Sequence, residues 1–176
     1  MTYPSFASGE VLTAADMNAV GLWLVKTQTV GTGVSTVAVT GAFSADYDTY
    51  RITYTGGSAS VSGTDLNFQL TGATGSNYET VLFYAGFGAS AVSCASTTAG
   101  AFAWAGQGVS NGNTMMVDVL KPFMAEPTRY SSQFWAGGVG WAQGRHTLAT
   151  SYTGFTIFPA SGTITGGTIS VYGYKK

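Results

Sequence analysis

The sequence predicts an all-β fold, a β-sandwich of the jelly-roll type, preceded by a short N-terminal extension that contains one helix. Three observations support this prediction. Apolar and polar residues alternate with a period of two over short runs, and these runs are rich in Val, Ile, Thr, Tyr and Phe. Segments of Gly, Ser and Asn separate the runs. Regular short strands with turns between them, about eight to ten here, are typical of sandwiches and jelly rolls.

The first 21 residues differ from the rest of the chain. Thr13 is a good helix N-cap, and Asp16, three residues later, approximates a capping box. This pattern predicts a helix over residues 13–20. We therefore divide the chain into an N-terminal attachment segment, residues 1–21, and a projecting β-sandwich domain, residues 22–176.

The strand candidates all combine alternation with β-branched or aromatic residues. They are residues 22–30, 34–40, 50–55, 66–70, 81–84, 115–120, 130–135, 155–158 and 168–174. By contrast, the segment 86–112 is rich in Gly, Ala and Ser. It predicts long loops with one weak strand near residues 102–104.

The composition of the 176-residue chain is low in charge but rich in aromatic residues. Charged residues make up 9% and aromatic residues 14%, against roughly 25% charged residues in ordinary soluble domains. The aromatic content argues against disorder. We expect a polar, nearly uncharged surface, part of which lies in a subunit interface. The seven Lys and Arg residues are scattered and the net charge is −1, so a nucleic-acid partner is not expected.

Targeting and membrane signals are not evident in the sequence. No apolar run approaches the ~18 residues of a membrane span, so membrane insertion is not expected. The N-terminus lacks the basic and apolar regions of a signal peptide, which predicts synthesis and solubility in a cytoplasm. The single cysteine, Cys94, cannot form an intrachain disulfide and is expected to be a small buried residue.

Residues that carry chemistry are few. The one histidine, His146, lies in a predicted Gly-Arg-His-Thr turn, where we expect it to be exposed or to pack, and one His with one Cys predicts no metal site. Asp46 and Asp48 predict a turn in which their side chains bind backbone N–H groups, with a Ca²⁺ site as a weaker alternative. No GxSxG nucleophile motif occurs. We expect no cofactor and no enzymatic activity, although a glycosidase built from distant carboxylates stays open.

Tryptophan and glutamine side chains near Gly-rich segments are candidate ligand-binding residues. They are Trp104, Trp135, Trp141, Gln107, Gln133 and Gln143. Exposed rings stack on the apolar face of a sugar, and amides bind its hydroxyl groups. The alternative is that the rings fill the sandwich core or a trimer interface. The sequence favours this alternative, because aromatic side chains dominate cores and interfaces alike.

Several stretches resemble the structural proteins of bacteriophage particles. The motif Phe6-x-x-Gly9-Glu10-x-Leu12-Thr13-Ala14-Ala15-Asp16-Met17-Asn18 resembles a segment at the N-terminus of many phage tail and tail-fibre proteins. Residues 152–174 are similar to the C-terminal β-domain of phage fibre-like structural proteins, and residues 43–52 and 119–123 belong to the same pattern.

The resemblance implies a bacteriophage tail-fibre type of virion structural protein, located in the virion tail and made in the host cytoplasm. It implies a homotrimer whose N-terminal segment joins other phage tail or virion proteins. Attachment would use Phe6, Leu12 and Met17. The resemblance implies no catalytic residues.

We therefore expect a receptor-binding subunit that mediates host attachment. Many weak contacts with a host-surface polysaccharide would add up to avidity. Two alternatives stay open. One is a purely architectural virion protein, such as a head decoration, collar or tail adaptor, without receptor contact. The other is an enzyme that acts on cell-surface glycan.

Overall fold

The computed structural model describes residues 9, 21–135 and 137–175, and in this part of the chain the secondary structure is β throughout. The strands are β1 Leu22–Thr29, β2 Val37–Val39, β3 Tyr47–Gly56, β4 Ser58–Ala59, β5 Thr64–Leu70, β6 Tyr78–Gly86, β7 Ser93–Ala99, β8 Phe102–Gly108, β9 Asn113–Leu120, β10 Arg129–Trp135, β11 Gly138–His146, β12 Phe155–Pro159, β13 Ile164–Thr165 and β14 Thr168–Lys175. The all-β prediction is confirmed. The predicted helix over residues 13–20 and the attachment residues Phe6, Leu12 and Met17 lie outside the described residues.

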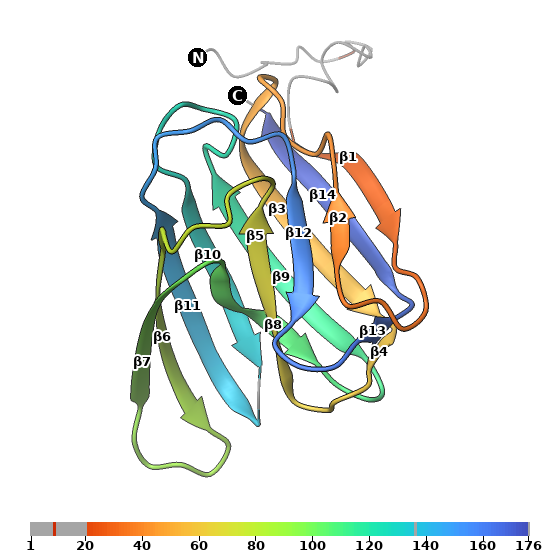
Figure 1. Ribbon diagram of the computed structural model, residues 1–176, viewed down its shortest axis with the longest axis vertical. Helices are drawn as coiled ribbons and strands as arrows, with labels where there is room; N and C mark the ends of the chain where they lie inside the picture. Colours follow the sequence, from red (N-terminus) through yellow and green to blue (C-terminus); the bar gives the residue numbers. More distant parts are fainter. Residues whose placement is uncertain (1–8, 10–20, 136, 176) are drawn as a thin grey trace.

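The strands form two facing layers (Figure 1). The larger layer runs in the order β1, β14, β3, β9, β10, β11, β6, β7, and neighbouring strands in it are antiparallel. The smaller layer has the order β2, β12, β5, β8. The layers are joined where β8 pairs with β9 through Gly106–Met115 and Gln107–Thr114. This arrangement is consistent with the predicted β-sandwich.

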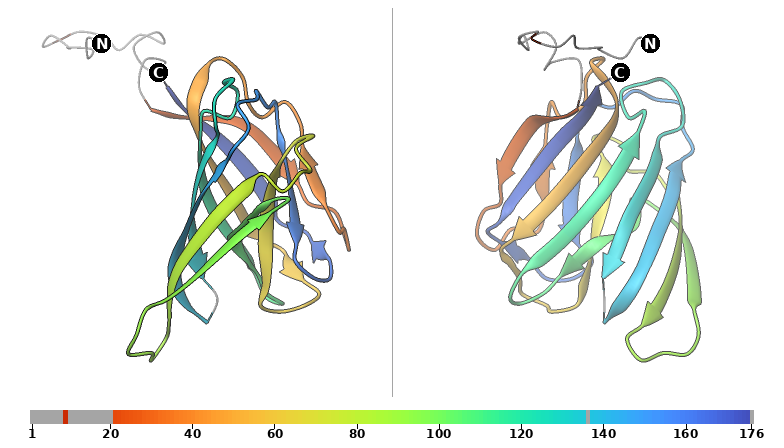
Figure 2. Two further views of the ribbon diagram at one scale, coloured as in Figure 1. Left: turned by 60° about the vertical axis from the view of Figure 1, so that its left-hand side comes forward. Right: turned by 180° about the vertical axis from the view of Figure 1, so that it is seen from behind.

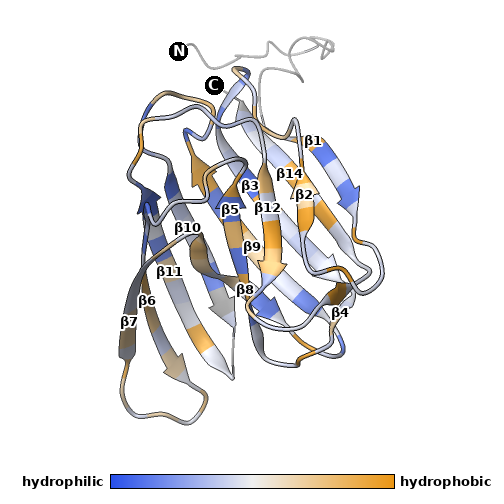
Figure 3. Ribbon diagram, in the orientation of Figure 1, coloured by the Kyte–Doolittle hydropathy of each residue, from blue (hydrophilic) through white to orange (hydrophobic). Residues whose placement is uncertain are grey.

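The core lies between the layers and follows from the alternation of the sequence. Strand β5 buries every second residue, and its hydrophobic and hydrophilic bands alternate in Figure 3. Phe68 on β5 faces rings from both layers. It stacks on Phe155, with ring centroids 4.8 Å apart, and lies 6.3 Å from Tyr130 and 6.4 Å from Phe102. These rings are the centre of the hydrophobic core.

The segment 86–112 differs from its prediction as long loops. It contains β7 and all of β8, which includes the weak strand predicted near residues 102–104, and β7 forms the edge of the larger layer beside β6. Cys94 is exposed on β7 instead of buried, because its register partner Phe83 faces outward. Backbone pairing with β6 holds a strand whose small side chains give little strand signal.

The turns predicted around Asp46 and His146 are partly wrong. Strand β3 already begins at Tyr47, and His146 is the last residue of β11. The Asp46 carboxylate makes a local contact, but it accepts a hydrogen bond of 2.9 Å from the side-chain hydroxyl of Ser44 and not from a backbone N–H group. His146 is fully buried, as a packing histidine, against Tyr78 and Tyr152.

Burial gives His146 an effect on pH stability. Its Nδ1 lies 3.2 Å from the Tyr152 hydroxyl, while its Nε2 is buried and has no hydrogen-bond partner among the described residues. Desolvation lowers the pKa of the imidazole below its ordinary 6.5, and a backbone hydrogen bond at Leu148 opposes the shift. The unfolded chain therefore takes up the proton first as the pH falls.

We expect the free energy of unfolding to decrease as the pH is lowered through about 6.5, the ordinary histidine pKa. The variant His146→Phe keeps a ring between Tyr78 and Tyr152 but cannot be protonated. Urea unfolding between pH 8 and 5 measures the effect. The wild-type chain should lose stability toward pH 5, and the variant should lose less. Equal slopes for both chains would assign the pH dependence to other groups.

Candidate functional site

The outer face of the larger layer is the side of the twisted sheet seen from behind in the right-hand view of Figure 2, with β1 and β7 at its two edges. Strand register arranges its side chains in straight rows across the strands. One row consists of Met116, Gln133, Trp141, Phe83 and Cys94. Its central side chains form the most exposed aromatic surface of the sheet, since Trp141 is 62% exposed and Phe83 is 52% exposed.

Strand β11 aims its large side chains outward because its inner face is built from small residues. Val139, Trp141 and Gln143 alternate with the inward-facing Gly140 and Ala142. A Cβ at Gly140 would lie 2.3 Å from the carbonyl oxygen of Phe83, so the backbones of β11 and β6 approach too closely there for any side chain. At Gly140 the inner side of β11 therefore has room only for backbone, while the next residue, Trp141, points outward.

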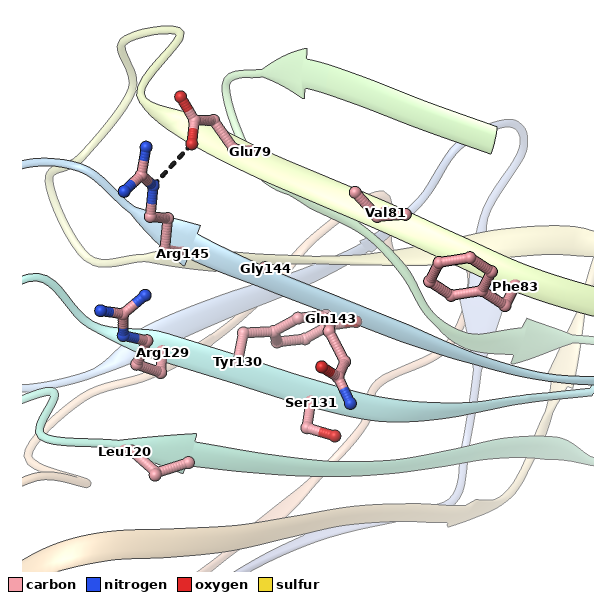
Figure 4. Close-up of a pocket in the computed structure, with 10 residues that line it drawn as sticks. All are labelled: Glu79, Val81, Phe83, Leu120, Arg129, Tyr130, Ser131, Gln143, Gly144 and Arg145. Atoms are coloured by element: carbon pink, nitrogen blue, oxygen red, sulfur yellow. Dashed lines mark hydrogen bonds and ion pairs between the residues drawn. The ribbon is translucent and has the colours of Figure 1, made fainter. Parts of the chain in front are cut away.

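Two hollows on this face adjoin the aromatic row. A small one, about 190 Å³, is lined by Gln133, Trp135, Val139, Gly140 and Trp141. A wider groove, about 810 Å³, follows β6, β11 and β10 as far as β9 (Figure 4). Its lining residues are Glu79, Val81, Phe83, Leu120, Arg129, Tyr130, Ser131, Gln143, Gly144 and Arg145. We call the outer face of β6, β10 and β11 together with these two hollows the aromatic face.

The structure brings together four of the six predicted ligand-binding residues. Trp135, Trp141, Gln133 and Gln143 share the aromatic face, because β10 and β11 are neighbours in register. For Trp135 and Trp141 the alternative of a place in the core is wrong, since they are 47% and 62% exposed. The structure does not test the alternative that these two rings lie in a subunit interface.

Trp104 and Gln107 lie apart from the other four, on β8. Trp104 has a positive φ of 58° and packs partly buried against the core. Its carbonyl accepts a 2.7 Å hydrogen bond from the Ser132 hydroxyl, and its side chain hydrogen-bonds Asp65. Desolvation raises the pKa of the Asp65 carboxyl, and the hydrogen bond with the Trp104 side chain opposes this shift. These contacts give Trp104 a structural role, separate from the aromatic face.

The predictions from sequence missed Phe83, Val81 and Arg129 as members of the aromatic face. Residues 81–84 read as a continuous apolar run, yet Val81 and Phe83 face outward while Leu82 is 3% exposed. Strict alternation with the polar Glu79 was the available signal for Val81 and Phe83. For Arg129 the sequence held no signal, because it joins the groove through strand pairing alone.

The charged groups of the outer face are mostly paired. Arg51 on β3 forms a two-pronged ion pair with Asp118 on β9, at 2.9 and 2.8 Å. Arg145 donates to Glu79 at 2.6 Å. Asp118 and Glu79 are three strand spacings apart, about 14 Å at ~4.8 Å per spacing. That exceeds the separation of carboxyl groups in a typical glycosidase.

The other half of the outer face carries many hydroxyl groups beside the Arg51–Asp118 ion pair. Across β1, β14, β3 and β9 one row consists entirely of threonines, namely Thr29, Thr168, Thr55 and Thr114. All four side chains are exposed. This half also holds the half-buried ring of Tyr172 on β14, opposite Arg51. The most exposed rings of the sheet, Trp141 and Phe83, lie toward β6.

Across residues 21–135 and 137–175, no group of three or more His, Cys, Asp or Glu side chains is placed to hold a metal ion. Within the same residues, no helix is long and apolar enough to cross a membrane.

Comparison with protein-family models finds no family that matches this chain, and comparisons with curated proteins and with solved structures find no significant match.

Proposed function

We propose that this chain is a structural subunit of a bacteriophage virion, of the tail-fibre type, whose jelly-roll-like β-sandwich attaches the particle to polysaccharide on the host cell. The observation that carries the proposal is the exposure of Trp141 and Phe83 side by side on one sheet, with Gln133 next to Trp141. The kind of particle is inferred from the resemblance of residues 6–18 to a segment of phage tail and tail-fibre proteins.

The aromatic face has the chemistry that sugars require. The ring of Trp141 offers an apolar surface for stacking, and the amides of Gln133 and Gln143 flank it with hydrogen-bond donors and acceptors. The groove is open, so an extended chain of sugars fits it better than a small enclosed ligand. Each site would bind weakly, and several copies on one particle would supply avidity.

A second candidate function follows from the same exposed rings. Contiguous exposed apolar side chains also mark protein–protein interfaces. In that case the aromatic face would pack against another subunit, and the chain would serve a purely architectural role as a decoration, collar or adaptor protein. The two functions differ in whether the isolated chain binds glycan.

Binding of the purified chain to bacterial envelope polysaccharides tests the proposal. We expect saturable binding to immobilised polysaccharide from at least one member of a panel of bacteria, and loss of binding after periodate has opened the sugar rings. Binding that survives periodate, or binding to none of the polysaccharides, would overturn the attachment function and favour the architectural one.

We also propose that the chain forms a homotrimer, which predicts a defined native mass. Low surface charge allows three copies to meet without repulsion, and closed cyclic symmetry gives a defined mass, about 54 kDa for three chains of 18.1 kDa. Light scattering after size exclusion measures this mass directly. We expect a single peak at the trimer mass that does not change on dilution. A stable monomer peak would refute the obligate trimer.

A further inference from the structure

The groove on the aromatic face has an uncompensated positive charge. One row across the strands consists of Leu120, Arg129, Arg145 and Glu79. Arg145 is neutralised by Glu79. Arg129 is exposed and has no carboxylate within ion-pair distance among the residues that the structure describes. With two arginines and one glutamate, the charged side chains that line the groove sum to one positive charge.

The position of Arg129 is costly for the folded chain. Its cross-strand partner is Arg145, and like charges directly opposite each other destabilise a sheet. Glu79 forms an ion pair with only one of the two guanidinium groups, that of Arg145. Figure 4 shows both groups extending toward the same end of the groove, with the ion pair drawn for Arg145 alone. A guanidinium held open in this way is suited to pair with two oxygens of a carboxylate.

The groove also has an apolar part, which leads to the aromatic row. Val81 and Phe83 line it from β6, and Leu120 closes it from β9. Arg129 lies four residues from Gln133, the neighbour of Trp141, which places it about 13 Å along the strand at ~3.3 Å per residue. This distance is longer than one sugar ring, so a ligand that reaches both ends is an oligosaccharide.

We propose that the aromatic face binds an acidic polysaccharide whose carboxylate pairs with Arg129 while a neighbouring sugar stacks on Trp141. This inference rests on the proposed function and specifies its ligand class. A singly charged carboxylate matches the single positive charge of the groove, whereas Glu79 would repel a more highly charged group.

The test uses pairs of probes that differ only in charge. Oligomers that contain galacturonic, glucuronic or sialic acid are compared with the same oligomers after methyl esterification, by calorimetry with the full chain. Three variants are measured: Arg129→Gln, Trp141→Ala and, as a matched control, Lys26→Gln, which removes one positive charge on β1 at the far edge of the sheet. Thermal unfolding verifies that each variant is folded.

We expect at least one acidic oligomer to bind about tenfold or more tightly than its ester, because a charge-assisted hydrogen bond is lost on esterification. Arg129→Gln should remove this preference, and Lys26→Gln should retain it. If esters bind as tightly as acids and Trp141→Ala weakens both, the acidic ligand is wrong and the attachment function stands. If no oligomer binds, the acidic ligand is refuted, and binding to envelope polysaccharides then decides the attachment function. Equal losses in Arg129→Gln and Lys26→Gln would assign the preference to net charge and overturn the role of Arg129.

Discussion

Replacing Trp141 by alanine is expected to weaken binding of the chain to envelope polysaccharide by tenfold or more while leaving the fold intact. The indole ring is 62% exposed, and its cross-strand neighbours are Gln133 and Phe83. Burial of the apolar face of a sugar against the indole contributes about 25 cal/mol per Å². A contact of roughly 60 Å² therefore supplies the ~1.4 kcal/mol of a tenfold change.

Stability should not change much, because the removed side chain makes no contact with the core. Substitutions of exposed side chains usually alter the free energy of unfolding by less than about 0.5 kcal/mol. Leu24→Ala is the matched control for the Trp141 variant. Leu24 is 58% exposed on β1, at the opposite edge of the sheet. It should unfold and bind as the wild-type chain does.

The two substitutions also separate glycan binding from assembly. A Trp141→Ala chain that binds polysaccharide normally but runs at a lower native mass would identify the aromatic face as a subunit interface. A chain that loses binding at unchanged mass supports attachment. Loss of binding in Leu24→Ala as well would contradict a local site on the aromatic face.

Strands with large alternating side chains were predictable from the sequence. In β3 and β5 the apolar residues recur at every second position, and burial in the sandwich follows them. Prediction failed where the inward positions are small. The inward residues of β11 include Gly138, Gly140 and Gly144, which gave no apolar period. These glycines lie against the backbone of β6, which is distant in the sequence, so no local sequence pattern predicts the contact.

The aromatic face could be predicted only in part from the sequence. Trp135 and Trp141 stood out because large rings are unusual in Gly-rich segments. That they share a face with Phe83 depends on the register of β6 against β11, which pairs residues almost sixty positions apart in sequence. Trp104 carried the same signal in the sequence, yet it packs against the core.

Replacing Phe68 by alanine is expected to lower the free energy of unfolding by about 3–5 kcal/mol. Phe68 is fully buried and contacts the rings of Phe102, Tyr130 and Phe155 with centroids 4.8 to 6.4 Å away. Alanine removes the ring from the space between the two layers, and the surrounding rings, fixed on three other strands, relax little into the cavity. Chemical denaturation followed by tryptophan fluorescence measures the loss.

Two further variants distinguish a cavity from a general effect of losing an aromatic residue. Phe68→Leu retains much of the volume and should cost less than the alanine variant, within about 2 kcal/mol. Phe87→Ala makes the same substitution at a ring that is 74% exposed in the loop between β6 and β7, and should cost less than about 0.5 kcal/mol. Because Phe68 faces away from the aromatic face, polysaccharide binding by the fraction of Phe68→Leu that is folded should equal that of the wild-type chain. A Phe68→Ala chain as stable as Phe87→Ala would mean that the two layers do not pack through this ring.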